Sequence, residues 1–473
     1  MNWRIGGFFV ALLAGVVVVM LRMPASAGGL WLTILWAAWI AAVVWAFTRP
    51  SFSLLFVAVM AAMLLFVILP ATDALFYGVT TIGGNDYAAG LVRALEIAAL
   101  AQCGMLAGAV AARGLWPVPS IRKLSPRLLP SRLDKAARWS VSVGVLAVIA
   151  FSALGGASLR SFLVYTTSSG YGTFARAATG DLGYLSAAED AAGLAVILLP
   201  LRLNGGRSGR SFRWSVLLVA ALATLVLLGG GQRGRFFVPV FAAGLIWLKT
   251  SEKRLPPRRL AFIGVLVLIL IGGVVGVARG AAGSRRMNLA TILTASVGSS
   301  NDLFLPLAGV AGSVPSQIPY LDGRSYLEVG TFLIPRALWS GKPQGSIARL
   351  TTEIDPGNSG LAFPEFGEMY ANFGLPGVIL GSLLLGALIE LISGRFARSA
   401  SIRESVFIAV CGAVLLDIFT RGAIAPMLTS FAGLLVAAAV ICRRKSHVLS
   451  EAPQPVQSES IRSGNTRRSV VPP

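Results

Sequence analysis

Residues 364–393 read PEFGEMYANFGLPGVILGSLLLGALIELIS, and the character of the chain changes within this stretch. The part up to Phe373 carries two glutamates, a tyrosine and an asparagine, whereas residues 374–393 are apolar apart from Glu390 and two serines. An apolar helix of this length crosses a hydrocarbon core about 30 Å thick. The stretch therefore predicts a transmembrane helix that begins directly after a polar segment.

Comparable apolar runs recur along the whole chain. Of its 473 residues, 55% are hydrophobic and 13% are charged, and the mean hydropathy is +0.75. This composition excludes an ordinary soluble globular protein, and helices are the structures that carry such runs across a bilayer. We predict an all-α polytopic membrane protein with about twelve transmembrane helices. The runs lie near residues 5–21, 29–47, 51–69, 91–112, 139–155, 184–201, 214–230, 236–248, 260–277, 374–393, 405–420 and 424–441.

The formal net charge of +21 is unevenly distributed. Lys and Arg concentrate in connections such as 113–138 and 249–259, which share one side of the membrane. The positive-inside rule places that side, and both termini, in the cytoplasm. The basic excess then needs no nucleic-acid partner. The predicted organisation is spans one to nine in 1–277, a large folded extracytoplasmic loop in 278–373 (the cap), spans ten to twelve in 374–442, and a disordered cytoplasmic tail in 443–473.

The chain ends and the three cysteines indicate no catalytic or metal site. Residues 5–21, followed by PASAGG, fit either a retained anchor or a cleaved signal peptide, and we favour the anchor. The three cysteines lie in or beside predicted spans and indicate neither a disulfide framework nor a metal site. His447, the only histidine, lies in the cytoplasmic tail.

Arginine dominates the basic residues predicted to face outward. Its planar, permanently charged guanidinium matches phosphate oxygens, which favours a phosphate-bearing ligand at the outer membrane face. The alternative is that these arginines pair with outer acids or extend to lipid headgroups. Arg233 and Arg235 stand out because GGGQRGRF (229–236) sets them at the membrane surface on a glycine-rich backbone. The other candidates are Arg160, Arg176, Arg279, Arg285, Arg286 and Arg349.

Acidic residues provide a second set of candidates. Glu365 and Glu368 are three residues apart and share one face if their stretch is helical, and Tyr370 and Asn372 add an aromatic and an amide group suited to sugar. The alternative is an interfacial aromatic belt with solvated acids. Within predicted spans, the adjacent Glu189 and Asp190 are costly to bury and are functional candidates. Two further acids are expected to pair with arginines. Glu96 lies one helical turn from Arg93 and can neutralise it, and Asp417 with Arg421 forms either an interhelical or an i,i+4 pair.

Three motifs resemble those of Wzy-type oligosaccharide repeat-unit polymerases, which make O-antigen and exopolysaccharide. They are GTFLIPRALWSGKP (330–343), GLAFPEFGEMYANFGLPGVILG (360–381) and GGGQRGRF. The resemblance implies a glycosyltransferase of the cytoplasmic (inner) membrane. It would move a growing glycan from undecaprenyl diphosphate onto a new repeat unit that is also linked to undecaprenyl diphosphate. The implied partners are this lipid-linked oligosaccharide, membrane lipids and a polysaccharide chain-length regulator.

The resemblance also implies roles for individual residues. Arg336 and Lys342 would clamp the diphosphate, and Trp339 would anchor the loop or stack on sugar. Glu368, and after it Glu365, would be the carboxylate base for a sugar hydroxyl. No Asp-x-Asp pair occurs in the chain, so we expect arginines in place of a metal and no cofactor.

Three alternative functions share parts of this pattern. O-antigen ligases have a similar cap, but they generally carry a functional histidine there, and this cap has none. A lipid-linked oligosaccharide flippase or another transporter is the alternative from a different class, which Glu189 and Asp190 keep open. A peptidoglycan polymerase of the shape, elongation and division type ranks below both because its usual loop motifs are not apparent.

Overall fold

The computed structural model describes residues 26–48, 53–82, 84–116, 121–122, 131–154, 185, 188–204, 218–219, 221–223, 233–251, 303–332, 334, 338–339, 341–342, 345–356 and 361–443. Within these ranges the chain is mostly helical, and its only strands, β1 (Thr81–Ile82) and β2 (Asn85–Asp86), form a short antiparallel hairpin. The predicted helical character is therefore confirmed for the described residues, which also contain this short hairpin.

Four helical segments in the described part are long and apolar enough to cross a membrane. They are α2 (Ala27–Thr48), the continuous helix Leu54–Tyr77, the helix Ala88–Leu115 and α19 (Glu365–Arg398). The second comprises α3 (Leu54–Met63), η1 (Leu64–Ile68) and α4 (Leu69–Tyr77), and the third comprises η2 (Ala88–Gly90) and α5 (Leu91–Leu115). They coincide with four of the predicted runs, and the count of twelve spans remains a prediction.

Three more predicted runs, 139–155, 236–248 and 405–420, coincide with α6 (Ser131–Leu154), α13 (Arg233–Thr250) and α20 (Ile402–Arg421). Two others are divided into shorter helices. The run 184–201 contains η4 (Asp190–Ala192), α10 (Gly193–Ile197) and the start of α11 (Leu199–Asn204), and the run 424–441 contains α21 (Ile424–Ser430) and most of α22 (Ala432–Arg443). The runs 5–21 and 260–277 and most of 214–230 lie outside the described residues.

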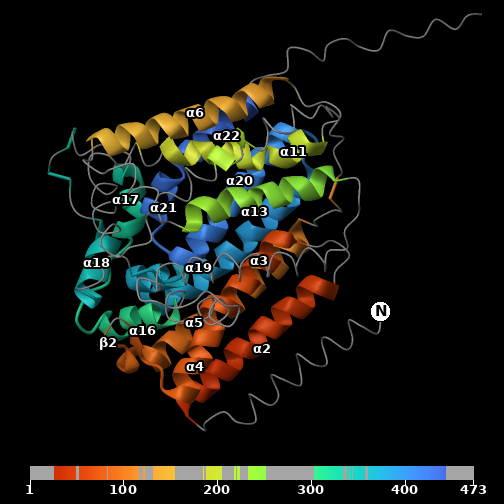
Figure 1. Cartoon of the computed structure of the whole chain (residues 1–473). Helices are drawn as coiled ribbons and strands as arrows, with labels where there is room; N and C mark the ends of the chain where they lie inside the picture. Colours follow the sequence, from red (N-terminus) through yellow and green to blue (C-terminus); the bar gives the residue numbers. More distant parts are fainter. Residues whose placement is uncertain are drawn as a thin grey trace, which may run out of the picture.

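The helices α5 and α19 pack against each other through glycine in the centre of the molecule (Figure 1). A Cβ atom on Gly108 of α5 would lie 1.9 Å from the carbonyl oxygen of Leu383, and one on Gly386 of α19 would lie 2.0 Å from that of Met105. The two backbones therefore touch directly, as they do where small residues line a membrane helix interface. Gly104 lies one turn before Gly108 and faces Ser382 of α19.

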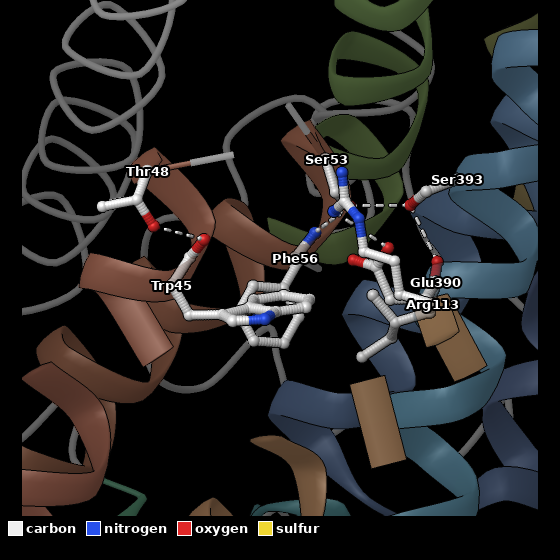
Figure 2. A network of polar contacts seen from close by, with 8 residues as sticks. Trp45, Thr48, Ser53, Phe56, Arg113, Glu390 and Ser393 are labelled. Carbon is white, nitrogen blue, oxygen red and sulfur yellow. Dashed lines mark hydrogen bonds and ion pairs between the residues drawn. The ribbon is translucent and has the colours of Figure 1, made fainter. Parts of the chain in front are cut away.

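A buried polar network joins four helices near the C-terminal ends of α5 and α19 (Figure 2). Arg113 of α5 forms an ion pair with Glu390 of α19 at 3.4 Å, and its guanidinium lies 5.4 Å from the ring centroid of Trp45 on α2. The hydroxyls of Ser53, which caps α3, and Ser393 are 2.8 Å apart. Because Arg113 belongs to α5 and Glu390 to α19, this ion pair fixes the register of α5 against α19. The pair lies toward the end of α19 that is opposite Glu365.

The helix α19 bends at Gly374, where the backbone has φ 63° and ψ −156°. The helix therefore begins at Glu365, earlier than the predicted start of span ten at residue 374, and the bend separates a first segment, 365–373, from the long apolar segment. The bend fits the sequence, because glycine readily adopts positive φ and Pro376 follows within two residues.

The described part of the predicted cap contains three short helices. They are α16 (Phe304–Ser313), α17 (Arg324–Phe332) and α18 (Ser346–Ile354). The helix α16 is almost fully buried and sits close to η2, since a Cβ atom on Gly90 would lie 1.8 Å from the Ala308 carbonyl oxygen. The described part of the predicted cap is therefore folded into short helices.

Candidate active site

The first turn of α19 places two glutamates together in a buried position. Pro364 is extended and precedes the helix, and Glu365 and Glu368 follow one turn apart on one face. The exposed fractions are 2% for Glu365 and 0% for Glu368, and the two carboxyl groups interact with each other. The helical stretch that the sequence analysis required for a shared face is therefore present.

Glu368 is held by the turn between α20 and α21. Its Oε2 accepts a hydrogen bond of 3.0 Å from the backbone N–H of Ile424, the first residue of α21. This turn needs an unusual backbone, because Gly422 and Ala423 have φ values of 58° and 55°. A Cβ atom on Gly422 would lie 2.8 Å from the carbonyl oxygen of Phe363, so glycine lets the turn approach the start of α19.

Glu365 is held from the other side by α17. The hydroxyl of Tyr326 donates to its Oε1 at 3.2 Å, and the Tyr326 ring stacks on Phe373 with centroids 6.1 Å apart. Burial, together with the nearby Glu365 and Glu368 carboxyls, raises the pKa of the Tyr326 hydroxyl above its usual value. Tyr326 therefore keeps its proton and acts as a donor to Glu365.

Asn372 completes the buried group two turns after Glu365. Its side-chain amide donates to the Ser325 hydroxyl at 2.8 Å and to the Glu368 backbone carbonyl at 2.8 Å. Ser325 also interacts with the Glu368 carboxyl. The consecutive residues Ser325 and Tyr326 thus bring α17 onto both acids and the amide. This cluster of Glu365, Glu368, Asn372, Ser325 and Tyr326 is called the acid pair site below.

Three buried oxygen atoms of the acid pair site have no hydrogen-bond donor from another described residue. They are Oε2 of Glu365, Oε1 of Glu368 and Oδ1 of Asn372. Among the described residues, neither glutamate has an ion pair. Buried acceptors of this kind are costly unless a proton, a ligand or a water supplies the missing donors. The arrangement suits a ligand rich in hydroxyl groups.

The cap helix α18 is anchored by a glutamate that sequence analysis did not single out. Both carboxylate oxygens of Glu328 on α17 accept from the Ser346 backbone N–H, at 2.8 and 3.0 Å, and the Ser346 hydroxyl donates at 2.5 Å. A carboxylate at a helix N-terminus satisfies free N–H groups and favours the helix dipole. No sequence signal links residues 18 positions apart in this way.

The other predicted site residues are dispersed or undescribed. Tyr370 is buried and its hydroxyl donates to the Val314 carbonyl at 3.1 Å, so here it joins α19 to the end of α16. Lys342 donates to the Ile334 carbonyl at 3.0 Å, and Trp339 is 39% exposed. Arg349 is exposed and paired with Glu353 at 2.7 Å. None of these four residues belongs to the acid pair site, and their substrate roles remain predictions.

Some predicted site residues lie outside the described part of the chain, and others lie on helices outside the acid pair site. Arg336, Arg160, Arg176, Arg279, Arg285 and Arg286 lie outside the described residues. Arg233 and Arg235 begin α13, but their side chains are not described. Two expected ion pairs are confirmed, Arg93–Glu96 at 2.5 Å and Asp417–Arg421 at 3.5 Å. Glu189 and Asp190 are buried beside α6 and α22, and their role remains a prediction.

Within the described ranges, no group of three or more His, Cys, Asp or Glu side chains is arranged to hold a metal ion. The metal-independent mechanism expected from the sequence remains a prediction.

The described helices define a polytopic α-helical membrane protein with a buried acidic site at one end of its central helix pair. The family model for the O-antigen polysaccharide polymerase Wzy matches residues 5–448, nearly the whole chain, and the chain belongs to this family. Membership supports a glycosyltransferase-like O-antigen repeat-unit polymerase and confirms the resemblance carried by the cap motifs. No curated protein and no solved structure matches the chain.

Proposed function

We propose that this protein transfers a growing glycan from undecaprenyl diphosphate onto an oligosaccharide repeat unit, also linked to undecaprenyl diphosphate, at the outer face of the cytoplasmic membrane. A hydroxyl oxygen of the acceptor repeat unit attacks the anomeric carbon of the growing chain. The bond from that carbon to the diphosphate oxygen breaks, and its electron pair leaves with undecaprenyl diphosphate. The hydroxyl proton passes to Glu368.

The observation that carries this proposal is the asymmetric environment of Glu368. One of its carboxylate oxygens is fixed by the Ile424 amide, while the other is buried and lacks a donor. A general base must be held in place and must have an oxygen that can accept the hydrogen bond of the sugar hydroxyl. In Glu368, Oε2 is held and Oε1 is that oxygen. The acid pair site lies at the end of α19 opposite Arg395 and Arg398, which agrees with an outer location under the positive-inside rule.

The leaving diphosphate requires cationic groups, which the acid pair site does not contain in its described part. We assign this role to the predicted arginines, with Arg336, Arg233 and Arg235 as the first candidates, acting without a metal. In this proposal a repeat unit reaches Glu368 when α17 moves away from α19, because Tyr326 and Ser325 cover both acids in this structure. A chain-length regulator is the proposed protein partner.

The test is deletion of the gene in the host, followed by separation of surface glycans by size. The proposal predicts that glycans shorten to a single repeat unit on their normal carrier, and that the wild-type gene restores long chains. Long polymer that accumulates on the lipid carrier would instead indicate ligation. Single units that accumulate on the cytoplasmic face would indicate transport. Either of these two results contradicts the proposed function.

A further inference from the structure

The two glutamates of the acid pair site have unequal surroundings. Glu368 receives the Ile424 N–H at 3.0 Å, and the Ala423 backbone amide and Ser325 also interact with its carboxyl. A backbone N–H that donates to a carboxylate stabilises its ionised form. The short turn at Gly422 and Ala423 presents the Ile424 N–H from the backbone, so the orientation of this donor is set by the fold.

Glu365 has no comparable support. Its carboxyl is buried, and the contacts the structure gives it are the neutral Tyr326 hydroxyl and the carboxyl of Glu368. The other charged group that acts on this pair from α17 is Glu328, which is also acidic. The nearest described arginine on α20, Arg421, is paired with Asp417. A second negative charge at Glu365 would therefore be buried beside the first without a described cation, which is strongly unfavourable.

We propose that the pair carries a single proton, that Glu365 holds it, and that Glu368 is the ionised member. Two ionised carboxylates can only accept hydrogen bonds, so they cannot bond to each other. With one proton on Glu365, its carboxyl donates a hydrogen bond to the Glu368 carboxylate. Glu365 is then a neutral positioning residue for the base, and it neither gains nor loses a proton during glycan transfer. This inference rests on the proposed function of Glu368.

Tyr326 has a defined part in this arrangement. Its hydroxyl donates to Oε1 of Glu365, which leaves the rest of that carboxyl to face its neighbour. The Tyr326 ring is fixed by its stack on Phe373, with only 7° between the two planes. Tyr326 therefore orients the protonated Glu365 and, through it, Glu368.

The test compares two isosteric variants, because glutamine mimics a protonated glutamate but not an ionised one. Each gene is returned to the deletion host at matched membrane levels, and glycan length is measured. Glu365→Gln is expected to lower polymerisation by a few-fold while glycans still extend beyond a single unit, because its amide can take the place of the protonated carboxyl. Glu368→Gln is expected to give single repeat units. If Glu365→Gln also gives single units, the assignment is wrong although the base at Glu368 stands. If Glu368→Gln keeps long glycans, the proposed base itself is wrong.

Infrared difference spectroscopy of the purified full-length protein gives a readout that is independent of activity. Wild type minus Glu365→Gln is expected to show the C=O stretch of a protonated carboxyl, and Tyr326→Phe is expected to shift that band while it keeps the ring stack. A difference spectrum with carboxylate bands alone would overturn the proposal. Because Tyr326→Phe removes one hydroxyl only, this comparison remains informative if Glu365→Gln fails to accumulate.

Discussion

Glu368 on α19 accepts a hydrogen bond from the Ile424 amide across 3.0 Å, so the N-terminal turn of α19 and the turn that follows α20 form one unit. The two residues are joined by the whole of α19 and α20, which run in opposite directions between them. The geometry of the candidate base therefore depends on the packing of these two helices and on the backbone of the turn at 422–423.

Gly422→Ala should damage the acid pair site. The substitution puts a Cβ on a residue with φ 58° and within 2.8 Å of the Phe363 carbonyl oxygen, so the turn must move and the Ile424 amide must leave Glu368. Polymerisation at matched protein level is expected to fall at least about tenfold, since small misplacements of catalytic groups are costly. Glycan length in the complemented deletion host measures this.

Gly78→Ala is the matched control for that change. Gly78 also has positive φ, 66°, but nothing lies within 4 Å of its added Cβ. It should cost only about 1 kcal/mol of backbone strain and leave glycan length unchanged. Equal loss of polymer in both variants would mean that the turn at Gly422 has no special role.

Gly108→Leu should prevent the correct packing of α5 against α19. The Leu383 carbonyl lies 1.9 Å from the position of the new Cβ, so the two backbones must separate. We expect loss of folded protein, measured as membrane level and as detergent-resistant monomer. Gly114→Leu, on the same helix with nothing within 4 Å of its Cβ, should keep the wild-type level. Normal accumulation of both variants would contradict the packing described here.

Arg113→Ala should destabilise the protein strongly. It removes one member of an ion pair whose side chains are 5% and 1% exposed and leaves Glu390 buried. Breaking such a pair costs about 3–5 kcal/mol, which thermal unfolding of the purified protein would detect as a large fall in Tm. Arg349→Ala, which breaks the exposed pair with Glu353, should cost about 0.5 kcal/mol or less. A Tm for Arg113→Ala close to that of Arg349→Ala would refute this role.

Glu328→Ala should loosen α18 without unfolding the membrane helices. The change removes the acceptor for the Ser346 amide and hydroxyl, and loss of such a cap costs about 0.5–2 kcal/mol. Hydrogen exchange in 346–354 is expected to become faster, while exchange in α5 stays slow. Glu353→Ala, in α18 itself but partly exposed, serves as the control and should leave exchange nearly unchanged.

Sequence analysis predicted the parts of this fold that depend on local patterns. Apolar runs located α2, α5 and α19, and the i,i+3 spacing of Glu365 and Glu368 predicted their shared face because the stretch is helical. The early start of α19 was missed, because the segment 365–373 contains polar residues and lacks the apolar pattern of a span. It is helical in a fold where α16 and α17 contact α19.

The partners of the two acids could not be predicted in the same way. Tyr326, Ser325 and Ile424 reach them across 39 or more residues of sequence, through contacts that only the packed helices create. Tyr370 differs from these residues, since its aromatic character suggested a sugar-binding surface and the structure shows its hydroxyl donating to the Val314 carbonyl. Its substrate role stays a prediction. Residue type was enough to predict which side chains could take part in acid–base chemistry. Burial and hydrogen bonding in the folded chain determine which of these side chains come together in one site.

The most direct test of the central claim is glycan length in the deletion host complemented with Glu368→Gln, with Glu353→Gln as the control that removes an exposed cap carboxylate. At equal membrane levels, Glu368→Gln should lower the polymerisation rate by about 10²–10⁴-fold, the usual contribution of a general base, and leave single repeat units. Glu353→Gln should restore long chains. Long chains of wild-type distribution from Glu368→Gln would contradict the account.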